Sequence, residues 1–339
     1  MNQFYLGHFK NYVDFTAESI GFDYRKELFT TAFVSVIGAA VFGSIELFLL
    51  KRRFANYPIG KKLLYKIFIH AMIILCLIWL GSLFYNTLRF QASPFSRQVL
   101  IGVRDFTTST GFIGNFMFIY MGVLLTLVLL TLNEVLGPGR LMELMSGKYT
   151  KALKEQRIFM FLDIKSSTTI AEQLGHELYF QMLNKFFADI TEPILQSGGT
   201  IYQYVGDEIV LTWPISDPDQ DQRFVEAFQR MRQVIDKEAN LYQKRFGIIP
   251  VFKAGAHCGE VTTGAVGLIK KEIIHTGDPL NTTARIEKKC NELDQVLIMS
   301  ADLQKRLPPK PSFTLVDLGQ HALRGKEKST RLFAVDFSI

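Results

Sequence analysis

The sequence predicts an α-helical membrane domain followed by a separate α+β domain. Hydrophobic residues make up 48% of the 339 residues, and three long apolar stretches precede residue 133. The remainder alternates short β-prone runs with amphipathic helical stretches over roughly 180 residues, enough to bury a full core. A Gly-Pro-Gly break at residues 137–139 separates the two halves.

We predict transmembrane helices over residues 28–50, 67–85 and 112–132, because each stretch, at roughly 19 to 23 residues, spans a hydrocarbon core of about 30 Å. Lys and Arg accumulate on the cytoplasmic side of membrane proteins. The loop KRRFANYPIGKKLLYK and the basic residues after the third span therefore face the cytoplasm. We thus predict a multi-pass protein of the cell inner (plasma) membrane with its C-terminal domain in the cytoplasm.

The flanking segments leave alternatives open. Residues 1–27 lack the continuous apolar core of a cleavable signal peptide and form either an interfacial helix or a loose tail. Residues 133–156 form a helical linker that is either a passive tether or a transducer, and residues 86–111 either stay outside or dip into the bilayer. Glu46 and His70 lie at similar depth, where they either reach the interface or form a pH-sensing pair.

The composition indicates which binding partners to expect. The sequence has no basic patch with interleaved aromatic residues, so we expect the lipid bilayer and no nucleic acid as partners. Cys76, Cys258 and Cys290 are far apart and form no C-x-x-C pair, which argues against a disulfide framework or a zinc site.

The C-terminal half begins with a strand at RIFMFLDI. A helix over STTIAEQLG follows, with a capping box from Thr169 to Glu172, and the next helix has apolar residues at helical steps up to Ile194. TIYQY and IVLTW are joined at hairpin spacing. The domain continues with a polar-faced helix over 219–243 and strands at PVFKAGAHCGEV and EIIHT. It ends with a helix at DPLNTTARIEKKCNEL and at least two more strands.

Polar residues gather at the ends of these elements. Asp163 ends the first strand and Asp207 lies in the hairpin turn, so neighbouring strands can bring the two carboxylates side by side, where a hard cation would hold them. A helix cap and a turn residue are the alternative roles. The hydroxyls of DIKSSTT lie at a strand-to-helix junction suited to phosphate. Asn281 and Arg285 share one helix face.

Residues 157–339 resemble the class III nucleotidyl cyclases, the adenylate and guanylate cyclases, and particularly the bacterial membrane-anchored type. The resemblance rests on FMFLDIKSST, GGTIYQYVGDEIVLTW, AGAHCGEVTTGAVG, HTGDPLNTTARIE and LRGKEKSTRLFAV, in the order of the family. It implies a ferredoxin-like α/β sandwich that converts ATP to 3′,5′-cyclic AMP and pyrophosphate.

The resemblance also implies site residues. Asp163, Asp207 and the carbonyl of Ile164 would bind two Mg²⁺ or Mn²⁺ ions. Asn281 and Arg285 would be catalytic, and substrate-binding positions would be Gln203, Ile274, Lys326, Ser166, Ser167 and Thr168. Family members place the metal acids on one protomer and the Asn and Arg on its partner, so we expect a homodimer. Glu208 is not a family ligand and is interpreted as a turn residue or a local ion-pair partner.

Two positions depart from the family pattern. Adenylate cyclases commonly have Lys where this chain has Gln203, and Asp or Thr where it has Ile274. Gln203 can still hydrogen-bond to a base, whereas Ile274 cannot, so base selectivity is expected to be weak. A guanylate cyclase and a non-catalytic nucleotide-sensing receptor stay as alternatives. The stretch VGDEI is similar to the GGDEF loop of a diguanylate cyclase. Such an enzyme is disfavoured, because Val205 interrupts that motif.

Overall fold

The computed structural model describes residues 24–46, 57–137, 139–269, 271–309, 311–326 and 328–337. They form two compact units, Met1–Leu141 and Met142–Ile339, which are described separately. Most of the expected N-terminal segment, the last residues of the first expected span and the first six residues of the basic loop after it lie outside the described residues. The predicted fold class is confirmed, because a helical region precedes an α+β domain.

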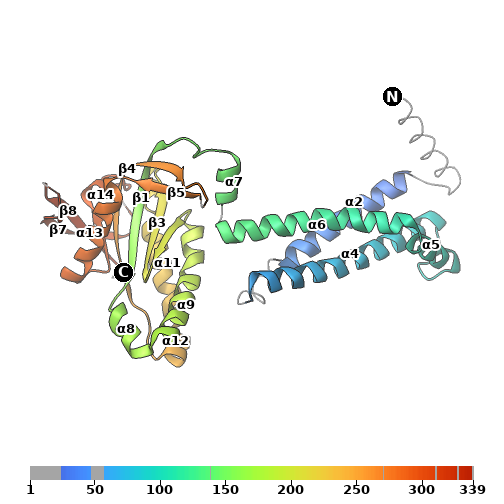
Figure 1. Ribbon diagram of the computed structural model, residues 1–339, viewed down its shortest axis with the longest axis horizontal. Helices are drawn as coiled ribbons and strands as arrows, with labels where there is room; N and C mark the ends of the chain where they lie inside the picture. The colour runs from blue at the N-terminus through green and yellow to red at the C-terminus, as the bar shows by residue number, and fades with distance from the viewer. Residues whose placement is uncertain are drawn as a thin grey trace. The chain divides into compact units, whose positions relative to one another are not determined.

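The first unit is built from helices α2 (Tyr24–Ser44), α4 (Ile59–Phe90), α5 (Arg97–Thr107) and α6 (Thr110–Leu136). Helix α4 packs against both α2 and α6 (Figure 1). Helices α4 and α6, which contain the expected spans 67–85 and 112–132, are long and apolar enough to cross a membrane. The apolar part of α2, Leu28–Ser44, is shorter, and residues 47–50 of the first expected span lie outside the described residues.

The segment between α4 and α6 contains the short amphipathic helix α5. The Ser96 hydroxyl accepts a hydrogen bond from the Val99 N–H at the start of this helix, which satisfies one of its free amides. Val99 and Val103 are buried. A Cβ added at Gly102 would lie 2.3 Å from the Asn86 Oδ1 of α4, so the missing side chain allows α5 to pack closely against α4.

Charged side chains in the first unit pair with one another between helices. Lys66 of α4 forms an ion pair with Glu46, and Lys62 forms one with Glu134 of α6. The His70 Nδ1 lies 2.7 Å from the Lys66 carbonyl oxygen, and its ring packs on Phe42 with 4.3 Å between ring centroids. The partner of Glu46 is therefore Lys66, and the structure gives no support to a Glu46–His70 pair.

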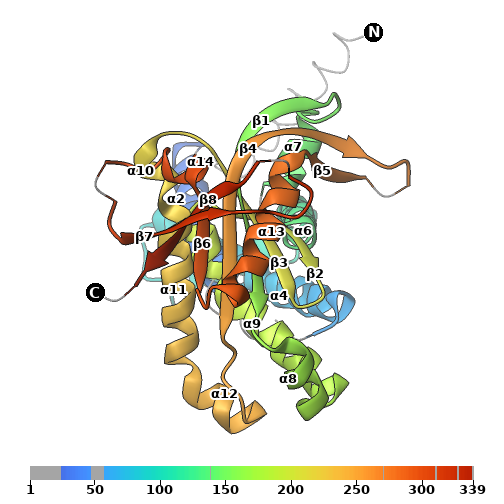
Figure 2. The same cartoon turned by 90° about the vertical axis from the view of Figure 1, so that its left-hand side faces the viewer.

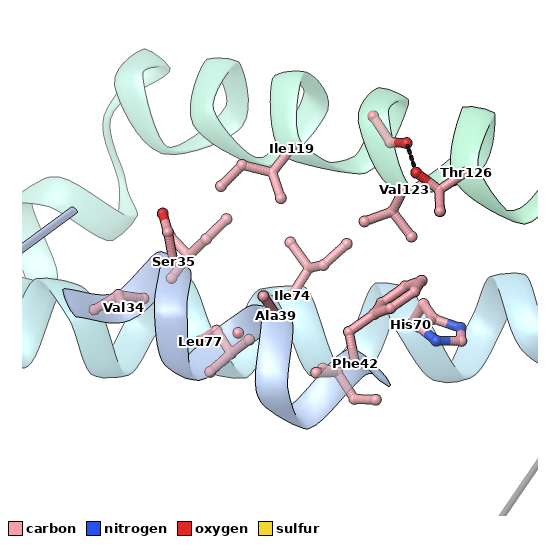
Figure 3. Close-up of a pocket in the computed structure, with 14 residues that line it drawn as sticks. Val34, Ser35, Ala39, Phe42, His70, Ile74, Leu77, Ile119, Val123 and Thr126 are labelled. Atoms are coloured by element: carbon pink, nitrogen blue, oxygen red, sulfur yellow. Dashed lines mark hydrogen bonds between the residues drawn. The ribbon is translucent and has the colours of Figure 1, made fainter. Parts of the chain in front are cut away.

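A cavity of about 370 Å³ lies between α2, α4 and α6. Its walls are mainly aliphatic, with His70 and Phe42 near one end (Figure 3). The His70 side chain is fully buried, and its Nε2 has no hydrogen-bond partner among the described residues. Gly38, Ala39 and Gly122 are part of the lining and contribute little side-chain volume, so the three helices do not close into a filled core at this level.

The second unit is built on one eight-stranded sheet with the order β2-β3-β1-β4-β6-β8-β7, in which β5 pairs with β4. Only the β4–β6 pair is parallel among the described strands. The strands are β1 (Leu153–Ile164), β2 (Thr200–Val205), β3 (Glu208–Pro214), β4 (Phe252–Val266), β5 (Glu272–Thr276), β6 (Leu297–Ser300), β7 (Thr314–His321) and β8 (Thr330–Asp336).

Helices cover both faces of this sheet. Helices α9 (His176–Gln196), α11 (Arg223–Lys237) and α12 (Ala239–Phe246) pack on the face that carries Ile158, Met160 and Leu162. Helix α13 (Asp278–Glu292) packs on the other face, where Leu280 and Ala284 meet Phe159 (Figure 2). Because side chains alternate along a strand, the odd-numbered residues of β1, including Asp163, lie on the α13 side. Short helices α7 (Arg140–Met145), α8 (Ser167–Leu174), α10 (Pro218–Asp221) and α14 (Ala301–Gln304) complete the described helices.

Two expected helices differ from those observed. The helix expected over 219–243 is divided into α10, α11 and α12, with short breaks near Gln222 and Glu238. Helix α8 begins at Ser167, so Thr169 lies inside the helix, and the predicted capping box at Thr169 is wrong. The β2–β3 hairpin has the predicted form, with Val205 paired to Glu208 across a turn of Gly206 and Asp207.

Candidate active site

Asp163 and Asp207 lie next to each other because β1 and β3 are neighbouring strands. Leu162 pairs with Ile209, so the end of β1 meets the start of β3 and the turn before it. Burial raises the pKa of the Asp163 carboxyl, Lys253 opposes this rise and contact with Asp207 adds to it, so that the pKa is about 6. Two acids that repel each other in a half-buried position are the arrangement expected of a cation site.

Lys253 is a positively charged residue that contacts Asp163. It faces Asp163 across the β1–β4 pair, with its Nζ 3.1 Å from the Asp163 Oδ2. It also forms an ion pair with Glu287 of α13, and both Lys253 and Glu287 are almost fully buried. Burial lowers the pKa of Lys253, and the two carboxylates more than offset this, so the net shift is upward. Sequence reasoning missed Lys253, although a lysine inside the apolar run VFKAGA was a usable signal.

Glu208 joins the same group of acids. It is the first residue of β3 and closes the hairpin turn opposite Val205. Burial, followed by the charges of Glu287, Asp163 and Asp207, raises the pKa of its carboxyl to about 7. Among the described contacts Glu208 has no ion pair, so the expected turn position is observed and the expected ion-pair role is not.

The junction between β1 and α8 adds hydroxyl groups beside the acids. Ile164 is the last residue of β1, and Ser166 precedes α8 with a left-handed φ of 57° and no side-chain capping hydrogen bond. Ser167 and Thr168 open the helix, so the first backbone N–H groups are left for an anion. Tyr179, which sequence reasoning did not identify, hydrogen-bonds with Ser167, and burial and the charge of Asp207 raise its pKa.

A second group forms around the first turns of α13. Asn281 and Arg285 lie one turn apart on this helix, and a Cβ added at Gly325 would be 3.2 Å from an Arg285 guanidinium nitrogen. The Lys326 Nζ lies 2.9 Å from the Asp278 Oδ2, and this contact lowers the pKa of Asp278. The structure thus brings Asn281, Arg285 and Lys326 to the same part of the domain.

The acids and this second group lie on different sides of α13. Glu287 faces Lys253 and, through it, Asp163. Arg285 precedes Glu287 by two positions, which is about 200° around a helix, and it lies against Gly325 instead. One chain therefore does not place its Asn281 and Arg285 over its own acids.

The two expected base-reading positions lie on strands that touch. Gln203 of β2 pairs with Val210, next to an irregularity after Ile201, and Ile274 of β5 pairs with Gly264. The residues next to them in the sequence are in contact, because the His275 N–H donates a 3.1 Å hydrogen bond to the Tyr202 hydroxyl. The rings of Tyr202 and His275 are 4.7 Å apart.

The acid group fits a divalent cation that is completed by substrate oxygens. Within the described residues no group of three or more His, Cys, Asp and Glu side chains is arranged to hold a metal by itself. Carboxylate oxygens are nevertheless the ligands that Mg²⁺ prefers, and Mg²⁺ is commonly held by one or two carboxylates together with substrate phosphates. Asp163 and Asp207 meet that requirement.

Comparison with known proteins places this domain in a family. The model of the adenylate and guanylate cyclase catalytic domain matches residues 150–335. Adenylate cyclase 2 of Rhizobium meliloti (strain 1021) is 36% identical over 197 residues, which cover 58% of this chain and 54% of that protein. The adenylate cyclase of Anabaena cylindrica is 25% identical over 182 residues, which cover 52% of this chain and 36% of that protein.

Solved structures agree in fold. The crystal structure of the adenylyl cyclase CyaB from P. aeruginosa has a TM-score of 0.50 and 20% sequence identity, and the match covers 56% of this chain and 97% of that one. The chain spans about half of the length of the Rhizobium meliloti relative and a smaller share of the Anabaena cylindrica relative.

Proposed function

The chain belongs to the family of adenylate and guanylate cyclase catalytic domains, and from this we propose that it is a membrane-anchored, homodimeric adenylate cyclase that converts ATP to 3′,5′-cyclic AMP and pyrophosphate. The observation that carries the proposal is the meeting of Asp163 and Asp207 at the ends of neighbouring strands within the matched region. A structural cap and a turn residue would not need to be in contact.

Asp163 and Asp207, with the carbonyl of Ile164, would hold two divalent ions, Mg²⁺ or Mn²⁺. When bound, such ions lower the pKa of a coordinated hydroxyl and neutralise phosphate charge. Lys253 would keep the Asp163 carboxylate oriented, since its ammonium lies 3.1 Å from that group.

Three residues of the second group would act on the triphosphate and the ribose. Arg285 carries a fixed guanidinium that stabilises charge developing at a phosphoryl group. Asn281, one helical turn away, would orient the ribose by hydrogen bonds. Lys326 would bind the terminal phosphates after exchanging its contact with Asp278 for them.

A homodimer would combine the two groups. Because Arg285 faces away from the acids of its own chain, a complete site requires the acids of one protomer and the Asn281 and Arg285 of its partner. A two-fold arrangement would produce two equivalent sites.

Membrane anchoring is supported by α4 and α6, which have the length and apolar composition of transmembrane helices. The 86–111 region would remain outside the bilayer core, because α5 is short and amphipathic. The basic residues that flank the expected spans favour a cytoplasmic catalytic domain.

ATP as the substrate is supported by the relative from Rhizobium meliloti, which is named adenylate cyclase 2. Gln203 would hydrogen-bond to the adenine, while Ile274 would contribute only an apolar contact. A site with one hydrogen-bonding position discriminates less than a site with two, so we expect measurable turnover of GTP.

The test is cyclic nucleotide production by the purified protein with Mn²⁺ and either ATP or GTP, beside Asp207→Ala. Asp236→Ala, an exposed acid near the end of α11, serves as the matched control. We expect cyclic AMP from the parent and from Asp236→Ala and none from Asp207→Ala. Cyclic GMP alone would indicate a guanylate cyclase. No product from a folded dimer would overturn the enzymatic proposal in favour of a nucleotide-sensing receptor.

A further inference from the structure

Glu287 connects the acids of the candidate cation site to helix α13. Its carboxylate forms an ion pair with the Lys253 ammonium, and the Lys253 Nζ lies 3.1 Å from the Asp163 Oδ2. Helix α13 and strands β4 and β1 therefore meet through one series of charged contacts. The contact with Asp163 is made at one carboxylate oxygen, and a carboxylate has a second oxygen that can bind a cation.

The members of this series differ in burial. The side chains of Glu287 and Lys253 are 5% and 3% exposed, whereas that of Asp163 is 25% exposed. Glu287 and Lys253 are enclosed by protein, and Asp163 is the member that a ligand can reach. Glu287 therefore acts on a ligand of Asp163 by way of Lys253 and not by direct contact.

The backbone holds Glu287 in this place. A Cβ added at Gly255 of β4 would lie 2.2 Å from the Glu287 backbone nitrogen, so the helix lies directly on the strand. The Cys290 thiol, about one turn further along α13, donates a 3.2 Å hydrogen bond to the Ala254 carbonyl oxygen. The position of the Glu287 carboxylate is thus fixed relative to the strand that carries Lys253.

Stability alone does not account for a charged pair here. A buried ion pair is often no more stabilising than well-packed apolar side chains of similar volume, and the neighbours of Lys253 in the run VFKAGA are apolar or small. Metal-binding carboxylates, in contrast, are usually held by further hydrogen-bonding groups that fix their orientation. Lys253 and Glu287 occupy the positions that such groups require, one and two contacts away from Asp163.

We infer that Glu287 is a positioning residue of the cation site, which holds the Lys253 ammonium on one oxygen of Asp163 and so keeps the other oxygen available to a divalent ion. Without Glu287, the ammonium would be held by Asp163 alone and would compete with the ion for both oxygens. The inference rests on the cation site of the proposed function and adds a residue to it. Helix α13 then serves two sites of a dimer, because Glu287 supports the acids of its own chain while Asn281 and Arg285 complete the site of the partner.

The first measurement is Mn²⁺ binding by the purified full chain without nucleotide, followed by the electron paramagnetic resonance signal of free Mn²⁺. Asp163→Asn defines the binding that occurs elsewhere on the protein. We expect Glu287→Gln to weaken Mn²⁺ binding about tenfold, because partners of metal-binding groups typically contribute about 10-fold to 100-fold in affinity. Glu292→Gln, which removes an exposed acid at the end of the same helix, is the matched control and should bind Mn²⁺ as the parent does.

A double-mutant cycle tests whether Glu287 acts through Lys253. Mn²⁺ binding is compared between Lys253→Met and Lys253→Met/Glu287→Gln, with circular dichroism to show that each variant is folded. The effect of Glu287→Gln should largely disappear once Lys253 is replaced, because residues that act in series are not additive. An equal loss of affinity in both backgrounds would overturn the inference.

Co-expressed chains distinguish this role from a displacement of α13, and they do so without Lys253→Met. A dimer of an Asp207→Ala chain and an Asn281→Ala chain keeps one site, which combines the acids of the second chain with the Asn281 and Arg285 of the first. Glu287→Gln should reduce activity at limiting Mn²⁺ more strongly in the Asn281→Ala chain than in the Asp207→Ala chain. The opposite order would show that the substitution acts through Arg285, and it would overturn the inference.

Failure of the proposed function would give a different result. If the parent binds no more Mn²⁺ than Asp163→Asn does, the cation site itself is overturned, and the inference with it. If the parent binds Mn²⁺ at Asp163 and Glu287→Gln binds it equally well, only the role of Glu287 is overturned.

Discussion

Lys253 explains how a group of acids is tolerated on a sheet face covered by α13. It forms ion pairs with both Glu287 and Asp163, in a position where an unpaired charge would cost several kcal/mol. Sequence reasoning identified the acids from their places at the end of a strand and in a turn. It did not identify their cation, because the contact depends on which residue of β4 faces Asp163.

We predict that Lys253→Met destabilises the protein by roughly 3 kcal/mol, because a buried partner carboxylate is then left uncompensated. Lys253→Arg keeps the charge and should cost less. Denaturant unfolding of the purified protein measures both, and the double variant Lys253→Met/Glu287→Gln should recover part of the loss. Equal stability of Lys253→Met and the parent would contradict the buried ion pair.

His257 gives a second residue-scale prediction, which concerns pH. Burial, helped by the charge of Lys326, lowers the pKa of His257 to about 4, and its Nδ1 lies 2.6 Å from the Ser300 Oγ. Between the unfolded pKa and the folded one, the unfolded chain binds a proton that the folded chain does not. The contribution of His257 to stability is therefore complete above about pH 6.5 and is lost as the pH falls towards 4.

As the pH is lowered from 6 to 5, we expect the unfolding free energy of the parent to fall by about 1 kcal/mol per pH unit more than that of His257→Gln. The comparison removes the contributions of Asp163 and Glu208, which also titrate in this range and are present in both proteins. Parallel pH profiles would show that His257 is protonated without penalty in the folded state.

At the scale of elements, β4 and α13 approach unusually closely. A Cβ added at Gly255 would lie 2.2 Å from the Glu287 backbone nitrogen, a distance that requires the helix to move. This approach holds Glu287 against Lys253 and sets the direction in which Arg285 projects. The glycine is visible in the sequence, but the helix that needs its missing side chain is not.

Gly255→Ala should therefore lower stability by roughly 2 to 4 kcal/mol and also reduce activity by shifting α13. Gly264→Ala on the same strand is the matched control, because its added Cβ would be 3.5 Å or more from its neighbours. Thermal unfolding and cyclic AMP production of the two variants test this. A mild effect of Gly255→Ala would mean that α13 adjusts without loss of the site.

At the scale of the whole molecule, the dimer has a specific consequence. Asp207→Ala and Asn281→Ala should each abolish activity, yet a mixture of the two co-expressed chains should regain it. Each mixed dimer keeps one site with both halves intact, so random pairing gives about a quarter of the parental activity. Activity in neither the single variants nor the mixture would contradict a site shared between protomers.

The sequence by itself determined the order of a helical region and an α+β domain, the β2–β3 hairpin, and the candidate residues Asp163, Asp207, Asn281 and Arg285. These follow from apolar periodicity, turn chemistry and motif order, which are properties of nearby residues. It located the apolar helices but not their full lengths, and it missed the division of the 219–243 helix.

Only the tertiary structure decided which of these side chains lie together. Strand register puts Lys253 opposite Asp163, the close approach of α13 adds Glu287 to them, and the side of α13 occupied by Arg285 separates it from the acids of its own chain. The physical reason is that these contacts join residues far apart along the chain through the register of a sheet and the rotation of a helix about its axis, neither of which the local sequence pattern specifies.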